Sequence, residues 1–371
     1  MRLGRLILAI AVAAGVVLSA PFIRDIRNFI KTNFPGQYVT FVGVAIAVVI
    51  GAGVLAALVR IRDRQVARYG AIAAALALGT AYALWNAQGI VEVDTVERFH
   101  FVEYGLVALL FYRAFRPSED PSTIVLPIVA GLIVGTCEEW LQWFIPGRVG
   151  DMRDVFLNVA ALVCGLLFSA GVDPPDRFTW TLQPGSRRRT AVVAAAAVIV
   201  FAAFVYSVHL GYEIGDVEAG RFRSRYDGGT LLVMSSDRTA RWRVAPPPTT
   251  PPSLSREDQY LSERILHVRE RNNRWKADDF AAAWFENRIL EKYYAPVLDI
   301  PNAGYRWPDE HRADSERRYN AGGAPPPSNF RSMADVAEGR HFIRLWPAAR
   351  VWGAALLIVI AVLAFGLRRS T

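Results

Sequence analysis

Residues 38–59 read YVTFVGVAIAVVIGAGVLAALV, a run without a single charged side chain. An α-helix needs about 20 mostly apolar residues to cross the hydrocarbon core of a bilayer. Eight segments approach this requirement, and they are 3–20, 38–59, 69–88, 99–115, 123–145, 155–172, 190–209 and 347–367. The sequence therefore predicts an α-helical polytopic membrane protein with about eight transmembrane helices.

The composition agrees with a membrane protein. Of the 371 residues, 53% are hydrophobic, which is too large a share for a single soluble domain. The net charge of +8 could indicate nucleic acid binding, but membrane proteins also retain Lys and Arg in their cytoplasmic loops. We therefore expect the lipid bilayer as a partner and no nucleic acid. Cys137 and Cys164 lie inside apolar runs, so no disulfide framework is predicted.

The first span has two interpretations. Arg2 and Arg5 precede a short apolar stretch that ends in the small residues Ser19 and Ala20, which is also the pattern of a cleaved signal peptide. We favour an uncleaved helix, although a signal peptide remains a real competitor.

Lys and Arg resist translocation, so the loops that carry them mark the cytoplasmic side. Such residues stand at alternate loops and at the C-terminus: Arg60, Arg62, Arg64 and Arg68; Arg113 and Arg116; Arg187, Arg188 and Arg189; and Arg368 and Arg369. Both termini are then cytoplasmic, and the acidic loop 92–97 lies outside. The first loop is the exception, because it carries Arg24, Arg27 and Lys31.

The same count divides the chain into a helical membrane domain at 1–209, a small α+β extracytoplasmic domain at 210–346, and a final helix with a cytoplasmic tail at 347–371. In the α+β domain, the segments 221–226 and 230–234 read as strands of a hairpin. The turn between them is Asp227-Gly228-Gly229, and a further strand is predicted at 239–244.

The rest of this domain reads differently. The proline-rich segment 246–252 is predicted to be a spacer. Leu261, Ile265 and Val268 then repeat at helical spacing, and Asp278 is predicted to cap a second helix. Residues 300–330, rich in Pro, Gly, Arg and Asn, read as irregular chain, and we expect His267 to be solvated.

Ionisable and amide side chains at membrane depth are costly unless they are paired or hydrated, so each one is a functional candidate. Three clusters stand out: His100, Glu103 and Tyr104 on one face of the fourth span; Glu138, Glu139 and Gln142 at the end of the fifth; and Arg148, Asp151, Asp154 and Asn158 along one stripe of the next loop and helix. All three map to the extracytoplasmic side.

An Arg–Asp network that only fixes two helix ends would explain the third cluster alone. It would not require the other two. We therefore predict a binding site composed of His100, Glu103, Tyr104, Glu139, Gln142, Arg148, Asp151, Asp154 and Asn158.

At these residues the chain resembles the VanZ-like family. The family pattern is matched by His100-Phe101-Val102-Glu103-Tyr104, Glu139-Trp140-Leu141-Gln142, Pro146-Gly147-Arg148, Asp151, Asp154 and Asn158. The family commonly carries a Lys three residues before the His, where this chain has Glu97. The resemblance covers residues 36–172 and says nothing of the domain at 210–346.

The resemblance implies a multi-pass protein of the bacterial cytoplasmic membrane and cell envelope. The family is named for a member associated with low-level resistance to the glycopeptide teicoplanin. We expect this protein to bind or modulate a membrane lipid headgroup or a lipid-linked cell-wall precursor at the outer face. Arg148 would hold phosphate or carboxylate in two parallel hydrogen bonds, oriented by Asp151 and Asp154. We expect no cofactor and no metal.

The alternative is a membrane enzyme. His100 and one of Glu139, Asp151 or Asp154 would act as acid and base on a lipid-linked substrate. Carboxylates with one imidazole could also hold a divalent cation. Because neither a nucleophile motif nor a paired-histidine zinc spacing is evident, we favour binding over catalysis.

Overall fold

In the computed structural model, the described residues are 3–87, 89–145, 150–244, 259–300, 303–321, 326–334 and 345–368. The chain divides into two compact units. The first, called the helical unit, comprises Met1–Gln142, Gly150–Phe204 and Trp352–Thr371. The second unit comprises Trp143–Val149 and Val205–Val351.

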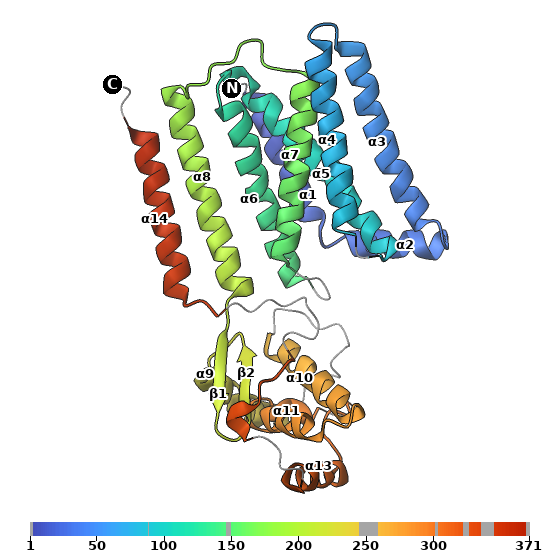
Figure 1. The fold of residues 1–371 in the computed structure, drawn as a ribbon, viewed down its shortest axis with the longest axis vertical. Helices are drawn as coiled ribbons and strands as arrows, with labels where there is room; N and C mark the ends of the chain where they lie inside the picture. The colour runs from blue at the N-terminus through green and yellow to red at the C-terminus, as the bar shows by residue number, and fades with distance from the viewer. Residues whose placement is uncertain are drawn as a thin grey trace. The chain divides into compact units, whose positions relative to one another are not determined.

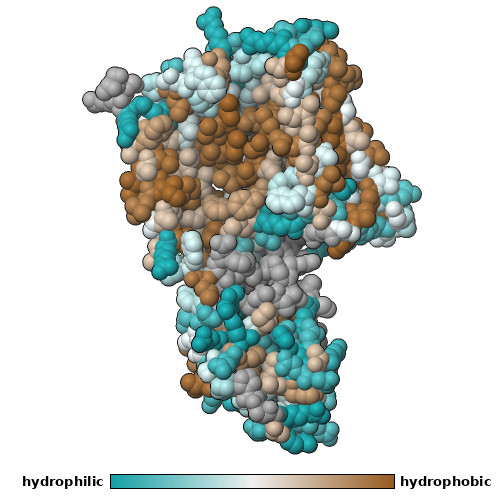
Figure 2. Space-filling model, viewed as in Figure 1, coloured by the Kyte–Doolittle hydropathy of each residue, from teal (hydrophilic) through white to brown (hydrophobic). Residues whose placement is uncertain are grey.

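The helical unit is built from helices, most of them long (Figure 1). They are α1 Leu3–Ser19, α2 Ile23–Asn33, α3 Tyr38–Arg60, α4 Gln65–Trp85, α5 Val91–Phe115, α6 Ser122–Phe144, α7 Met152–Val172, α8 Pro184–Phe204 and α14 Ala348–Leu367, with a 3-10 turn η1 at Arg116–Ser118. Figure 2 shows that the visible sides of these helices are covered by hydrophobic side chains. Such a surface is suited to lipid.

Within the described residues, six helices are long and apolar enough to cross a membrane: α3, α4, α6, α7, α8 with its π-helical continuation η2 Val205–His209, and α14. The pair α1 and α2, bent by 64°, would make a seventh. Helix α5 is not among them, because charged residues such as Arg98, Glu103 and Arg113 are spaced along it. The helical membrane class is therefore confirmed in outline, and the count of eight spans stays a prediction.

Close packing of α5 against α7 forms the centre of the helical unit. A side chain on Gly165 would place its Cβ 2.6 Å from the Cα of Gly105, so glycine is required at this crossing. Tyr104 and Ala108 of α5 are fully buried beside it, in a core that also includes Ala9 from α1. This packing holds the polar residues of α5 and α7 close to each other.

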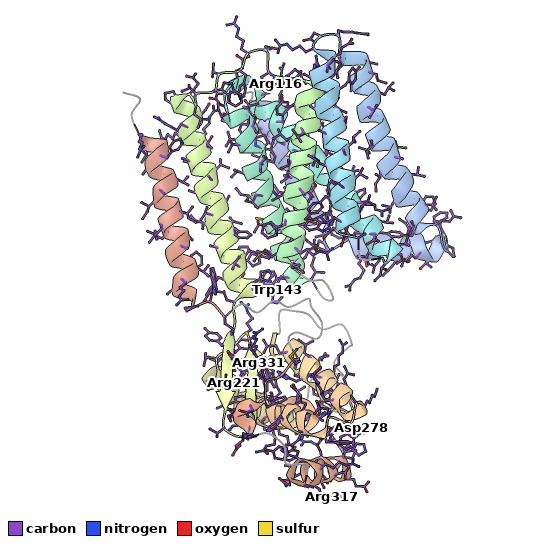
Figure 3. All side chains as sticks on the ribbon, viewed as in Figure 1. Arg116, Trp143, Arg221, Asp278, Arg317 and Arg331 are labelled. Carbon is purple, nitrogen blue, oxygen red and sulfur yellow. The ribbon has the colours of Figure 1, made fainter. Side chains whose placement is uncertain are left out.

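The end of the helical unit where α5 finishes is closed by an arginine. Arg116 donates to the carbonyl oxygen of Pro174 at 3.0 Å from Nε and 2.8 Å from Nη2, and it pairs with Asp176 at 2.9 Å. Figure 3 labels Arg116 at this end. These bonds join the α5–α6 connection to the α7–α8 connection.

The second unit has its own hydrophobic core. Its elements are β1 Tyr212–Asp216, β2 Gly220–Ser224, α9 Gly228–Val244, α10 Gln259–Lys276, α11 Phe280–Tyr293, α12 Ala295–Leu298, α13 Asp309–Ala321 and a 3-10 turn η3 at Pro327–Asn329. β1 and β2 pair antiparallel with Ile214 opposite Phe222, and both side chains enter the core with Ile289 and Leu290 of α11. Arg221 of β2 also bridges to Arg331, and both are labelled in Figure 3.

The predicted hairpin across Asp227-Gly228-Gly229 is wrong. The hairpin lies earlier, where Asp216 accepts hydrogen bonds from the amides of Glu218 and Ala219 and Gly220 adopts φ +81°. Asp227 instead caps α9, because its carboxylate accepts from the amide and hydroxyl of Thr230. Segments 230–234 and 239–244 are therefore helical and not strands.

Three further predictions in this unit are wrong. Asp279, and not Asp278, caps α11 by accepting from the amide of Ala282 at 3.2 Å. Part of 300–330 forms the helix α13, which many charged residues stabilise from the surface. His267 is 2% exposed, and its Nδ1 lies 2.7 Å from Glu286. The helical repeat at 261–268 is confirmed by α10, and the spacer 246–252 lies outside the described residues.

Candidate binding site at the polar end of the helical unit

The candidate site lies where α5 begins, α6 ends and α7 begins, an end of the helical unit called here the polar end (Figure 1). Helices α5 and α7 run antiparallel to α6, so residues 91–104, 138–142 and 151–158 come to the same end. Each cluster predicted from the sequence contributes to it. Because successive helices run in opposite directions, polar residues up to about 60 positions apart in the sequence lie at the same end of the helical unit.

Glu138 connects α6 to α5. It is 4% exposed, accepts a short hydrogen bond from the hydroxyl of Tyr104, and accepts a second at 3.1 Å from the amide of Gln142. Gln142 is one helical turn after Glu138, which brings the two side chains together on α6. Both donors are neutral, so these bonds orient the carboxylate without neutralising its charge.

Glu139 connects α6 to α7. It is 1% exposed, accepts from Gln142 at 3.3 Å and accepts from the backbone amide of Asp151 at 3.1 Å. Asp151 in turn caps α7 by accepting from the amide of Arg153 at 3.0 Å. The capping function proposed for an aspartate in this cluster is therefore real, and it operates inside a larger network.

Asn158 of α7 is a buried polar residue of the site. It is 1% exposed, and within the described part of the chain neither its Nδ2 nor its Oδ1 has a hydrogen-bond partner. Gly135 of α6 leaves room for it: a Cβ there would lie 3.2 Å from Nδ2 of Asn158 and 3.4 Å from the hydroxyl of Tyr104. Burying an amide without hydrogen bonds costs free energy, so the side chain of Asn158 can still donate to or accept from a bound group.

His100 and Glu103 lie one turn apart on α5 and are each 17% exposed. Nδ1 of His100 is 3.5 Å from the carboxylate of Glu103, and this nitrogen is buried without a hydrogen bond to any described residue. One ligand atom from each of His100, Glu103 and Glu138 lies within 4.8 Å of the others. Asp154 is partly buried on α7 and interacts electrostatically with His100.

A second polar connection lies beside the site. Arg153 of α7 pairs with Glu97 of α5 at 2.9 Å and donates to both the side chain and the backbone carbonyl of Asn86, at 3.3 and 3.2 Å. Glu97 occupies the position where the family commonly has Lys. A lysine there would face Arg153 with like charge, so Glu97 and Arg153 form a matched pair in this chain.

The structure thus brings together eight of the nine predicted site residues, and Arg148 lies outside the described residues. Two contributors were not predicted as site residues, Glu138 and Arg153. A signal for Glu138 was present, because it stands four residues before Gln142 in an otherwise apolar helix. The partner of Arg153 could not be read from the sequence, because Glu97 is 56 residues away.

An apolar cavity opens on the neighbouring face of α5. It has a volume of about 730 Å³ and is lined by side chains of α3, α4, α5 and α7, including Gly53, Gly79, Phe101 and Phe168. Arg98 is the charged residue of this lining, and it is exposed. In the described part of the chain no hydrogen bond or ion pair engages its guanidinium group.

Comparison with known proteins finds one family model that matches part of this region. Residues 77–172 match the family model described as VanZ/LLP1, so this part of the chain is similar to that family. The match begins later than the resemblance at 36–172 and includes all described members of the site. No significant match to a curated protein or to a solved structure was found.

Proposed function

We propose that this VanZ-like membrane protein binds the headgroup of a lipid or of a lipid-linked cell-wall precursor at its polar end. The observation that carries the proposal is Asn158, a buried amide that offers one acceptor and two donors and uses none of them among the described residues. Sugar hydroxyls, peptide groups and phosphates would satisfy such an amide.

The surrounding residues support a polar ligand. Glu139 and Gln142 are buried and held in place by hydrogen bonds, so a ligand group would meet oriented partners. In this proposal Arg148 supplies the cation for an anionic group, because a guanidinium fork can bind phosphate or carboxylate with two parallel hydrogen bonds.

The apolar cavity supports a lipid as the source of that headgroup. Its lining by Gly53, Gly79 and Phe168 suits a hydrocarbon chain, and Arg98 suits a phosphate near the chain. His100 and Glu103 lie on the adjoining face of the same helix, so one amphiphilic molecule could engage both regions. The polar end would then face outward in a bacterial cytoplasmic membrane.

Native mass spectrometry of the detergent-purified protein tests this proposal. We expect an anionic lipid or precursor to remain bound to the wild type and to be lost from Asn158→Leu and Arg148→Ala. Ser186→Ala is the control, because Ser186 of α8 is also a buried polar residue but lies outside the cavity lining and accepts a hydrogen bond from Arg189 at 3.1 Å. Equal occupancy in all four proteins, or none in the wild type, would contradict the proposal.

A cellular measurement addresses the link to glycopeptides that the family resemblance implies. Expression of the wild type in a bacterium that lacks it should raise the minimum inhibitory concentration of teicoplanin at least twofold over the empty vector. Asn158→Leu should remove that increase and Ser186→Ala should keep it, at equal protein levels. An unchanged concentration with the wild type would limit the proposal to lipid binding without a resistance phenotype.

A further inference from the structure

The arrangement of His100, Glu103 and Glu138 is that of ligands around a cation. One ring nitrogen and one oxygen from each carboxylate lie within 4.8 Å of one another. Ligands about 2.1 Å from a tetrahedral ion lie about 3.4 Å from one another, so an approach of up to about 1.4 Å would bring all three ligand atoms to a metal. Side-chain rotations alone can supply such a movement.

The state of these side chains points in the same direction. Nδ1 of His100 is buried and has no hydrogen bond to a described residue. This nitrogen could therefore coordinate a cation. Glu138 is 4% exposed and accepts only from the neutral groups of Tyr104 and Gln142 among the described residues. A buried carboxylate is stabilised far more by a cation than by neutral donors.

The neighbours of the ligands also resemble those of metal sites. Ligating carboxylates in proteins are usually oriented by hydrogen bonds from a second layer of residues, and Tyr104 and Gln142 do this for Glu138. Asn158 is an independent observation, because its amide is 1% exposed and has no hydrogen bond to a described residue. Its Nδ2 and the hydroxyl of Tyr104 lie 3.2 and 3.4 Å from the position that a Cβ on Gly135 would take. A water or ligand atom bound to the metal would give that amide a partner.

The donor set decides the class of cation. Imidazole nitrogen is favoured by Zn²⁺ and other transition metals, while carboxylates also suit Mn²⁺. Three protein ligands leave at least one coordination position for water or an exogenous group, as in open zinc sites. Mg²⁺ and Ca²⁺ prefer oxygen ligands alone and fit this set less well.

We propose that His100, Glu103 and Glu138 bind one Zn²⁺ or Mn²⁺ ion, whose open coordination position accepts an anionic oxygen of the headgroup. The first part of this proposal stands on the geometry of the three side chains. The second part rests on the proposed function, because it requires a headgroup at the polar end. The proposal also revises our expectation that no metal is bound.

Metal content and affinity test the first part. Full-length protein in detergent is stripped with a chelator and titrated with Zn²⁺ or Mn²⁺ by calorimetry, and elemental analysis then counts retained metal. We expect one ion per chain in the wild type. Glu138→Gln and His100→Gln should weaken binding more than about 100-fold, since the loss of a residue that only orients a ligand already costs 10- to 100-fold.

Glu92→Gln is the matched control. Glu92 lies on the same helix and also near its start, but it pairs with Lys31 at the surface. This variant should bind the ion as the wild type does. Thermal unfolding in detergent establishes that each variant is folded, and bound Mn²⁺ provides a spectroscopic readout because nitrogen coupling from His100 should disappear in His100→Gln. Wild-type binding weaker than millimolar, or equal affinity in Glu138→Gln, would overturn the proposal.

Lipid occupancy separates this proposal from the proposed function. Native mass spectra of metal-loaded wild type and Glu138→Gln are compared for co-purifying anionic lipid. If metal binds and no lipid is retained, the metal site stands and the proposed function fails. If lipid binds equally with and without the ion, the proposed function stands and coordination of the headgroup is overturned.

Discussion

Glu263 of the second unit is a buried residue whose two carboxylate oxygens both accept hydrogen bonds. Burial raises the pKa of this carboxyl, and hydrogen bonds from Ser224, Tyr294 and the amide of Arg225 oppose that effect. These bonds are 2.6, 2.8 and 2.6 Å long. They connect α10 to β2 and to the end of α11.

Replacing Glu263 should therefore weaken the second unit. Glu263→Ala leaves two buried donors and one partly buried donor without an acceptor, and we expect a loss of about 3 kcal/mol in the free energy of unfolding. Hydrogen exchange of β2 and α10 in the full-length protein measures it. Glu310→Ala, at an exposed position of α13, is the control and should change protection little. Unchanged exchange in Glu263→Ala would show that water replaces the lost acceptor.

Asp216 predicts a dependence of stability on pH. Burial by itself would raise the pKa of Asp216, but hydrogen bonds from Lys292, Tyr293 and two backbone amides outweigh it and lower the pKa from 3.8 to about 2. The carboxylate is 6% exposed and lies 2.8 Å from Nζ of Lys292. Its folded form thus prefers the charged state.

Because the folded pKa is depressed, the stabilisation is present above pH 3.8 and is lost as the pH falls towards 2. The shift corresponds to about 2 kcal/mol of folding free energy. Hydrogen exchange of β1 measured between pH 5 and pH 2 should reveal this loss, after correction for the intrinsic exchange rate. In Asp216→Asn the second unit should be less stable at pH 5, and the difference from the wild type should shrink at pH 2.

Among the elements, the approach of α5 to α7 depends on glycine. A Cβ on Gly165 would lie 2.9 Å from the carbonyl oxygen of Gly105 as well as close to its Cα, and backbone cannot give way as a side chain can. Gly165→Val should force the helices apart at a cost of about 3 kcal/mol. Thermal unfolding in detergent measures it, with Gly51→Val as the control, because nothing lies within 4 Å of a Cβ at Gly51. Equal melting temperatures would contradict this packing.

A substitution that fills the cavity between α3, α4, α5 and α7 should weaken lipid binding without unfolding the protein. Gly79→Leu would project a side chain towards Phe101 in the cavity, where a Cβ meets the ring at 3.5 Å without a clash. We expect it to reduce co-purified lipid severalfold while the protein stays folded. Gly70→Leu on the same helix meets nothing within 4 Å and should leave lipid occupancy unchanged. Similar lipid occupancy in both variants would show that the hydrocarbon chain of the lipid does not bind in this cavity.

At the scale of the whole molecule, the basic residues of the first loop are explained by α2. Arg24, Arg27 and Lys31 lie on a helix that also exposes Ile26 and Phe29. A helix with basic and apolar residues of this kind can lie along a membrane surface. Positive charge on such a helix is compatible with the predicted outward position of the first loop.

The orientation that follows is directly testable. Alkaline phosphatase fused after residue 230 should be active, and a fluorescent protein fused after residue 371 should fluoresce, because we expect the first site outside the cell and the second in the cytoplasm. Activity of the two reporters in the reverse order would invert the topology. The polar end would then face the cytoplasm, and a ligand at the outer face would have to be abandoned.

The sequence by itself determined the membrane class and most of the helices, because apolar runs such as 38–59 have no stable alternative in water. It also determined which polar residues share a face within one helix, as His100, Glu103 and Tyr104 do, since that depends only on helical spacing. These local relationships predicted eight of the residues that the structure brings to the polar end, but they did not include Glu138 or Arg153.

Only the tertiary structure decided which faces meet. The contact of Glu138 with Tyr104, the room that Gly135 leaves for Asn158, and the pairing of Arg153 with Glu97 depend on the rotation and distance of separate helices. It also decided that Asp227 caps a helix, because Leu231 of that helix is fully buried in the core of the second unit. Spacing along one chain segment contains no information on the partner that the segment will meet, and packing supplies it.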